Sequence, residues 1–246
     1  LGRVKLRDLV FDIVHINVHK TFSTPHGGGG PGAGPVCVKR GLAKYLPTPV
    51  VVSGPVKDSA EPTFWFEEPS KTIGRIGSAW GNFGVLIRAY TYLRMHGEAG
   101  LKDVSGAAVL NANYLRVKLR DAFDLPYDRT CMHEAVFAAT RQRRDDGVKA
   151  GDVCKRLLDH GFYAPTVYFP LIVEEALMIE PTETESPETL DSFIDVMNQI
   201  AREARENPEL VKSAPHHTPV RRIDEARACL LYTSPSPRDL STDRMP

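Results

Sequence analysis

The fold of this chain is decided by one stretch, Val10-Phe11-Asp12-Ile13-Val14-His15-Ile16-Asn17-Val18-His19-Lys20-Thr21-Phe22-Ser23-Thr24-Pro25-His26, which runs into four glycines, Gly27 to Gly30. Residues 10–18 form a short segment rich in β-branched side chains, which predicts a buried strand. Because side chains alternate along a strand, Asn17 and His19 are expected on the same face. Lys20 follows directly, so the sequence places an amine just past the end of a buried strand.

An amine in that position suits covalent chemistry. Burial disfavours the ammonium form of a lysine and lowers its pKa, which makes the neutral amine a nucleophile. Schiff-base formation with an aldehyde cofactor requires such an amine. Asn17 and His19 could hydrogen-bond a cofactor phosphate, and glycines 27–30 would let a ligand or a partner approach closely. A lysine at a strand end is more often an ordinary surface residue, so the residues alone leave both interpretations open.

Composition excludes several classes of protein. The 246 residues carry 31 basic and 31 acidic side chains, whereas nucleic-acid and anionic-membrane binders usually have a basic excess. An apolar run of about 18 residues, which a transmembrane helix needs, does not occur. The four cysteines are scattered without a CxxC pair, so a disulfide framework and a structural zinc site are not expected, and a reducing compartment is. His15, His19 and His26 lack the spacing to carboxylates that a metal site needs, and no metal is predicted.

The middle of the chain mixes loop and helix signals. Residues 36–38 predict a second short strand, and the proline-rich residues 41–75 predict a loop or linker. A helix is expected from the capping residue Asn82 to Gly97, and a longer helix over 98–123. The apolar stripe expected to be buried on the first of these helices consists of Phe83, Leu86, Ile87, Tyr90 and Leu93.

The last third of the chain alternates between strand and helix patterns. Strands are expected near 131–139 and 166–180, and helices over 152–160 and 187–205. Ser186 is the expected N-cap of the last helix, with Pro187 at its first position. This order of elements predicts a compact α/β subdomain with helices packed on one face of a sheet.

Both ends of the chain look unusual. The first residues carry neither an initiator Met nor a signal-peptide pattern and lead straight into the expected strand, so we interpret the start as a chain cut within a fold. Residues 229–246 are rich in Ser, Pro and charged residues and show no periodicity, which predicts disorder. This tail resembles translated adapter sequence and is expected to be non-native.

The string His19-Lys20-Thr21-Phe22-Ser23-Thr24-Pro25-His26, together with the glycines, Pro31 and Gly32 after it, resembles the cofactor-lysine segment of glycine dehydrogenase (decarboxylating), the P-protein of the glycine cleavage system. The resemblance covers residues 1–227 and is nearest to the separate second subunit of split bacterial enzymes, here as a C-terminal fragment. The tail departs from the family ending. Further segments that resemble the family are 81–84, 110–115, 125–129, 131–134, 165–171, 178–186 and 213–216.

The resemblance implies an α/β fold, that of a fold-type I pyridoxal-phosphate enzyme related to aspartate aminotransferase. The chain would comprise the end of the large domain and the small C-terminal α/β domain. Residues 1–80 would close the cofactor-binding domain with the lysine loop. Residues 81–228 would form a helical connector and the small domain, and 229–246 the disordered tail. Because the family's other ring-binding residues would lie outside this chain, the chain alone is expected to be inactive.

The resemblance also implies a reaction and its partners. Lys20 would hold pyridoxal 5′-phosphate covalently, Asn17 and His19 would contact its phosphate, and Thr21 and His26 would be further cofactor-binding residues. Glycine would be decarboxylated with release of CO2, and its aminomethyl group would pass to the lipoyl group of the H-protein. A first subunit of the P-protein would complete a heterotetramer in the bacterial cytoplasm, with neither nucleic acid nor membrane as a partner.

Three alternatives stay open at this point. Another fold-type I enzyme, such as an amino-acid decarboxylase or a desulfurase, would lack the glycine run after the lysine. A non-catalytic assembly subunit would have no use for Lys20. A fragment inactivated by truncation would keep the lysine segment without activity. Arg75, Arg88, Arg129 and His133 lie in segments that resemble the family, and their roles are left unassigned.

Overall fold

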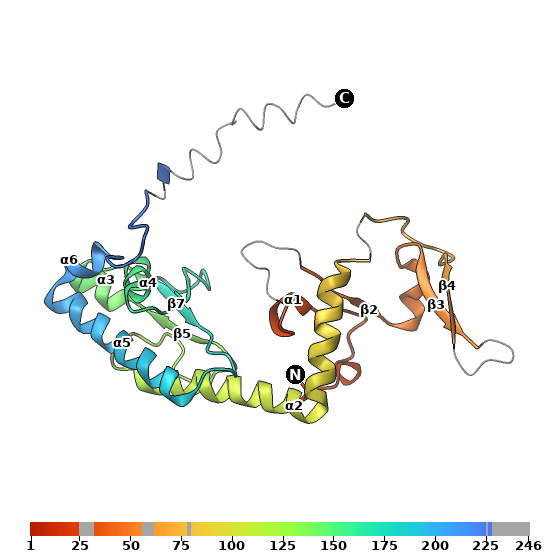
Figure 1. Cartoon of the computed structure of the whole chain (residues 1–246), viewed down its shortest axis with the longest axis horizontal. Coiled ribbons are helices and arrows are strands. Elements are labelled where there is room, and N and C mark those ends of the chain that lie inside the picture. Colours follow the sequence, from red (N-terminus) through yellow and green to blue (C-terminus); the bar gives the residue numbers. More distant parts are fainter. Residues whose placement is uncertain (25–31, 56–61, 78–79, 225, 228–246) are drawn as a thin grey trace. The chain divides into compact units, whose positions relative to one another are not determined.

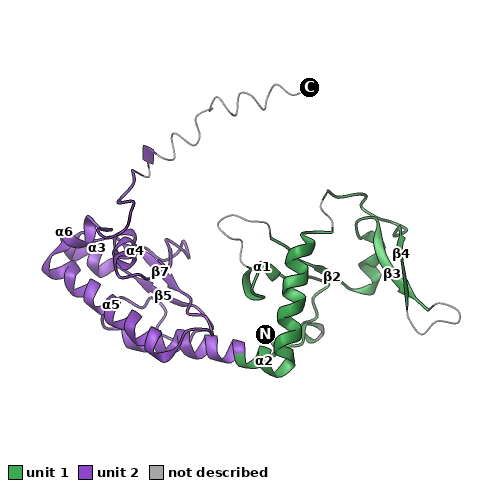
Figure 2. Cartoon of the chain, viewed as in Figure 1, with its two compact units in different colours: residues 1–103 green, residues 104–246 purple. Residues whose placement is uncertain are grey.

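The computed structural model describes residues 1–24, 32–55, 62–77, 80–224 and 226–227. The chain divides into two compact units, residues 1–103 and residues 104–246 (Figure 2). This division falls inside α2 (Phe83–Leu119), whereas the sequence placed a boundary between residues 80 and 81. The tail 229–246 lies outside the described residues.

Unit 1 contains a short antiparallel pair of strands, β1 (Ile13–His15) and β2 (Val36–Val38). β2 confirms the strand expected at 36–38. The strand expected over 10–18 is wrong in length, because only three of its residues pair with β2 before the chain enters α1 (Val18–Thr21). It is also wrong in burial, since both ends of β1 are exposed. A 3-10 helix, η1 (Leu6–Leu9), precedes it.

The proline-rich segment of unit 1 is more ordered than the sequence predicted. It contains a 3-10 helix, η2 (Arg40–Tyr45), and an antiparallel hairpin of β3 (Val50–Gly54) and β4 (Thr63–Glu67). The expectation of an irregular loop over 41–75 is therefore wrong. Two β-branched and aromatic runs form this hairpin, and its prolines fall outside the paired residues, where they cost no ladder hydrogen bond.

The core of unit 1 joins the segment around Lys20 to the first half of α2. Val18, Phe22 and Ala33 pack against Ala89, and the Phe22 ring meets Tyr92 edge-on at 6.0 Å between ring centroids. The predicted apolar stripe of this helix is largely wrong, because the helix turns the Ala89 side toward the lysine segment. Of the predicted stripe only Leu86 packs there, and the exposed members are Phe83, Ile87, Tyr90 and Leu93.

A single glycine interrupts α2. Gly97 has φ 61° and ψ −170°, which is not helical, and glycine adopts a positive φ without the steric cost that other residues meet. The first helix ends at Gly97, as expected, and the second follows directly after a kink without an intervening loop. The second half ends at Leu119, four residues before the end that the sequence predicted.

Unit 2 is built on a three-stranded antiparallel sheet with strand order β5-β7-β6. Its strands are β5 (Ala135–Ala138), β6 (Thr166–Val167) and β7 (Ala176–Ile179). Its helices, besides the second half of α2, are α3 (Thr140–Asp146), α4 (Ala150–Asp159), α5 (Pro187–Glu206) and α6 (Pro208–Lys212). The expected α/β subdomain is confirmed, with α3 and α6 as additional short helices.

Strand alternation explains how this sheet is covered. Phe137 and Leu177 belong to the helix-packed core, whereas Ala138 and Ala176 on the opposite face meet Val173.

Among the described helices, not one combines the length and apolar character that a bilayer crossing requires.

Helix α5 follows its sequence signals closely. The Ser186 hydroxyl accepts a hydrogen bond from the Thr189 N–H at 3.2 Å, and Pro187 begins the helix, as predicted. Its inward-facing apolar side chains Leu190, Ile194, Met197 and Ile200 are buried. Figure 1 shows α5 running beside the second half of α2, where the Tyr114 hydroxyl donates to Asp191 at 2.5 Å.

Candidate functional site

Helix α1 carries the candidate lysine and is tied to the core on one side. The Val18 N–H donates to the Ala33 carbonyl at 3.2 Å, and the Thr24 hydroxyl donates to the Val18 carbonyl at 2.5 Å. Thr24 is itself almost fully buried, as are Val18 and Phe22. These contacts hold one short helical turn with its apolar side inward and place Lys20 on the outer side.

Lys20 is exposed in this structure. The prediction that a strand end buries it is therefore wrong for this chain, since Lys20 lies on a helix whose inward positions belong to Val18 and Phe22. Its ε-amine forms neither a hydrogen bond nor an ion pair with any residue in the described ranges. The chain thus presents an unengaged amine on the surface of unit 1.

The helical turn changes which residues share a face with Lys20. On a helix, side chains three and four positions apart are neighbours, so Lys20 and Thr21 of α1 each lie near Asn17, the N-cap of this helix. The sequence placed Asn17 and His19 on one face because it predicted a strand there. That pairing is wrong, and Thr21, which is exposed like Lys20, takes the place of His19 beside Asn17.

Asn17 has a buried polar atom that lacks a partner. Its Oδ1 atom is shielded from solvent and has no hydrogen bond. Leaving such an atom unpaired costs free energy, typically about 1–3 kcal/mol. An amide can be turned over without changing its shape, which would put its NH2 group in the same place. The position therefore suits a ligand group that either donates or accepts a hydrogen bond.

The ring of His19 is fixed by the backbone of Ala33. The Ala33 N–H donates to Nδ1 at 3.1 Å, and the Ala33 carbonyl lies 3.0 Å from the same atom. When Nδ1 accepts from the backbone, the neutral imidazole carries its proton on Nε2, which makes Nε2 a donor. Such a donor suits an anionic group. His26 and glycines 27–30, which the sequence added to the site, lie outside the described residues.

Gly32 is required by the His19 ring, and this gives a testable expectation. A Cβ atom at Gly32 would come within 2.6 Å of His19 Nδ1 and 2.8 Å of Cε1. Gly32→Ala should therefore displace the ring from Ala33 and lower the free energy of unfolding by about 1–2 kcal/mol, the usual cost of overpacking. Urea denaturation of the full chain, followed by circular dichroism, measures this loss.

A matched control lies in the same unit. A Cβ atom at Gly41 would meet nothing within 4 Å, so Gly41→Ala should change the stability little. If the two variants unfold at the same urea concentration, the close contact between Gly32 and His19 does not exist in solution.

A second feature, which the sequence did not reveal, is a cavity of about 400 Å³ in unit 2. Its polar lining includes Arg116, Tyr127, Arg129, Cys131 and Glu134. Burial raises the pKa of the Cys131 thiol, which keeps that thiol protonated and makes it a poor nucleophile.

The wall of this cavity is set by a contact between two segments that resemble the family. The Asn113 amide donates to the Cys131 carbonyl at 2.8 Å and accepts from its N–H at 3.1 Å. This two-way clamp fixes the chain just before β5. The sequence did not predict that residues 110–115 and 131–134 are in contact. Neither segment carries a pattern that identifies the segment it packs against.

The comparison with known families identifies the second unit. Residues 104–220 match the family described as "Glycine dehydrogenase, C-terminal domain", and the match begins at the first residue of unit 2. A "Probable glycine dehydrogenase (decarboxylating) subunit 2" from Listeria innocua is 58% identical over 228 residues, or 93% of this chain. The chain belongs to the glycine dehydrogenase (decarboxylating) family.

Other glycine dehydrogenase relatives give the same result. Proteins with the same description from Fervidobacterium nodosum and Bacillus velezensis are 56% and 55% identical, each over 228 residues. The chain spans 46% of the Listeria innocua protein, 47% of the Fervidobacterium nodosum protein and 45% of the Bacillus velezensis protein. It therefore covers about half the length of the curated relatives that it matches.

A solved structure supports the fold. The chain aligns with a crystal structure of glycine decarboxylase (P-protein) of the glycine cleavage system in an inhibitor-bound form, with a TM-score of 0.65 and 20% sequence identity. The alignment covers 81% of this chain and 46% of that chain. The fold is that of this fold-type I glycine dehydrogenase, as the lysine segment predicted.

Proposed function

We propose that this chain supplies the cofactor-binding lysine of a glycine dehydrogenase. The proposed enzyme decarboxylates glycine with pyridoxal 5′-phosphate, releases CO2 and transfers the remaining aminomethyl group to the lipoyl group of the H-protein. The observation that carries this proposal is the 58% identity to a glycine dehydrogenase subunit 2 over 93% of the chain. The unengaged amine of Lys20 supports it chemically.

The residues around Lys20 fit an aldehyde that carries a phosphate. Lys20 offers an amine without a competing partner among the described residues. Asn17 offers an amide whose buried oxygen has no hydrogen-bond partner. His19 offers an imidazole with one nitrogen held by the backbone. When bound, pyridoxal phosphate supplies the electron sink that makes loss of CO2 from glycine feasible.

Each residue has a proposed task. Lys20 holds the cofactor covalently through its ε-amine, because an amine is the group that condenses with an aldehyde. Asn17 and His19 are the proposed phosphate contacts, as the resemblance implies, and this proposal does not depend on a shared strand face. Thr21 and His26 are further proposed cofactor contacts, and Thr21, like Lys20, lies near Asn17. Lys20 is exposed here, so this chain alone does not provide the water exclusion that such chemistry favours.

The proposed partners follow from the names of the relatives. The description "subunit 2" implies a first subunit, and we propose that this chain assembles with such a subunit in a heterotetramer within the bacterial cytoplasm. The lipoylated H-protein and glycine are the proposed substrates. Neither nucleic acid nor a membrane is a proposed partner.

A chimaeric protein tests this function. The part of the Listeria innocua subunit that lies outside the match would be fused ahead of residues 1–246 and co-expressed with that organism's first subunit. The proposal predicts release of labelled CO2 from carboxyl-labelled glycine, dependent on lipoylated H-protein. A folded, assembled chimaera without this release would favour the alternative, in which the chain is a non-catalytic fragment or assembly subunit.

A further inference from the structure

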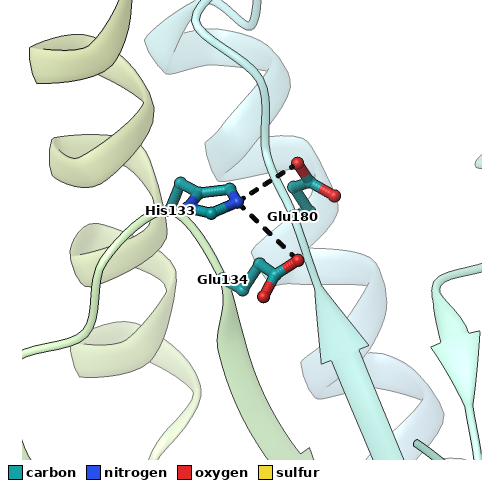
Figure 3. A group of neighbouring side chains, drawn as sticks. All are labelled: His133, Glu134 and Glu180. Carbon is teal, nitrogen blue, oxygen red and sulfur yellow. Dashed lines mark ion pairs between the residues drawn. The ribbon is translucent and has the colours of Figure 1, made fainter. Parts of the chain in front are cut away.

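Three potential metal ligands gather at one end of the sheet in unit 2. His133 and Glu134 lie directly before β5, and Glu180 lies directly after β7 (Figure 3). Their ligand atoms all lie within 4.8 Å of one another. His133 and Glu180 are exposed and Glu134 is half-buried, so solvent and ions can reach the group. Neither the resemblance nor the proposed function assigns a role to this cluster.

The backbone places the two glutamates opposite each other. β5 and β7 are antiparallel, with Ala135 paired to Ile179. One step further along the ladder, Glu134 therefore faces Glu180. Two like charges directly across a sheet destabilise it, so this arrangement has an electrostatic cost that a positive charge between the two carboxylates would remove.

Lys and Arg side chains do not remove this cost by close contact. In the described part of the chain, neither Glu134 nor Glu180 forms an ion pair with a Lys or an Arg. The structure pairs both glutamates with His133, whose Nε2 lies 3.7 Å from an oxygen of each. That distance is too long for a hydrogen bond. Figure 3 shows the ring nitrogen directed between the two carboxylates, with both gaps of similar size.

We propose that His133, Glu134 and Glu180 bind one divalent transition-metal cation of the Zn²⁺ class. Imidazole nitrogen and carboxylate oxygen bind Zn²⁺ at about 2.0–2.2 Å. Adjacent ligand atoms around such an ion are therefore about 3–3.5 Å apart, by the same bond lengths. The two 3.7 Å separations are only slightly larger, and rotation of two exposed side chains closes them. An imidazole ligand favours Zn²⁺ over Mg²⁺ and Ca²⁺, which prefer oxygen donors. Water fills the remaining positions.

Calorimetry of the full chain tests the site. Protein stripped with EDTA would be titrated with ZnCl2, and Co²⁺ would serve as a spectroscopic probe because it absorbs visible light in such ligand fields. Because the chain has 8 histidines, variants must identify the site. His133→Asn and Glu180→Gln should each weaken Zn²⁺ binding at one site by about tenfold or more, since even indirect support of a metal ligand is worth that much.

Matched controls separate this site from general metal binding. His217→Asn and Glu206→Gln change an exposed histidine and an exposed glutamate far along the chain from the cluster, and both should leave the Zn²⁺ affinity unchanged. Metal-free Glu180→Gln should melt no lower than the parent chain, because it removes a like-charge pair. Zn²⁺ should raise the melting temperature of the parent chain more than that of Glu180→Gln.

Two results would overturn the proposal. One is a Zn²⁺ titration and Co²⁺ spectrum that are the same in the parent chain, His133→Asn and Glu180→Gln. The other is the absence of Zn²⁺ binding to the folded parent chain, which would make the cluster an ion-pair group only. The catalytic proposal for Lys20 is unaffected by either result, because it uses none of the three cluster residues.

Discussion

Lys20→Ala is expected to lower glycine decarboxylation by the chimaeric enzyme by a factor of about 10³ or more, because removing a covalent catalytic group typically costs at least that much. Alanine has no amine, so the cofactor can no longer be held covalently. The absorbance near 420 nm (roughly, from the chemistry of a protonated imine) should disappear together with the activity. Parallel spectra and CO2-release assays of the two proteins measure both effects.

Two control variants make this result specific. Lys20→Arg keeps a positive charge but lacks a condensing amine, so it should behave like Lys20→Ala. Lys71→Ala removes another exposed lysine of unit 1 and should keep both the absorbance and the activity. Retention of the band in Lys20→Ala, or its loss in Lys71→Ala, would assign the anchor to a different residue.

Asp159→Ala is expected to destabilise unit 2 by about 3 kcal/mol, because it breaks a buried, hydrogen-bonded charge pair. The Asp159 side chain is 0% exposed and lies 3.0 Å from the Arg156 guanidinium. One of its oxygens accepts the N–H groups of His216 and His217 at 2.5 and 2.8 Å. Arg156 also makes a two-pronged contact with Glu203 at 2.8 and 3.1 Å. The network thus ties α4 to α5 and to the segment after α6.

Lowering the pH should reduce the stability that this network contributes, as the direction of the pKa shift of Asp159 requires. Burial of Asp159 opposes its charged form, but hydrogen bonds from His217, His216 and Arg156 outweigh burial and hold its pKa below the usual value. A carboxyl group with a lowered folded-state pKa contributes stability above its unfolded pKa, about 3.9, and loses it as the pH falls through the folded value. The parent chain should therefore lose stability below about pH 4, and Asp159→Ala should lose less over the same range.

Urea denaturation at pH 7 and at pH 3 would measure these differences, with Asp195→Ala as the matched control. Asp195 is an exposed residue of α5, and its replacement should change the unfolding free energy by less than about 0.5 kcal/mol. Asp159→Asn keeps an oxygen for the two backbone donors but loses the charge, so its stability should lie between those of the parent chain and Asp159→Ala. Equal stability of all four proteins would show that the network contributes nothing.

Local signals predicted the fold best where they were complete within a few residues. Ser186 and Pro187 mark the start of α5 without help from the rest of the chain, and β2 was predicted at its full length. The predicted stripe of the first half of α2 failed because Phe83 and its neighbours satisfy helical periodicity on a face that this chain leaves exposed. Periodicity locates an apolar face, but it does not say what covers that face.

For the candidate site, the sequence pointed to residues by resemblance but did not predict their geometry. The string from His19 to His26 pointed to a cofactor lysine by resemblance, and the comparisons confirmed the family. The expected strand is shorter than the sequence predicted, because its pairing with β2 ends at His15, and Lys20 lies on the short helix α1 that follows. His133 and Glu180 are 47 positions apart, and only the pairing of β5 with β7 brings them together.

Mass spectrometry tests the central claim about Lys20 most directly. The chimaeric enzyme would be reduced with borohydride, which makes an imine bond permanent, then digested and sequenced. The account predicts that the pyridoxyl group is found on Lys20. A pyridoxyl group on another lysine, with Lys20 unmodified, would contradict it.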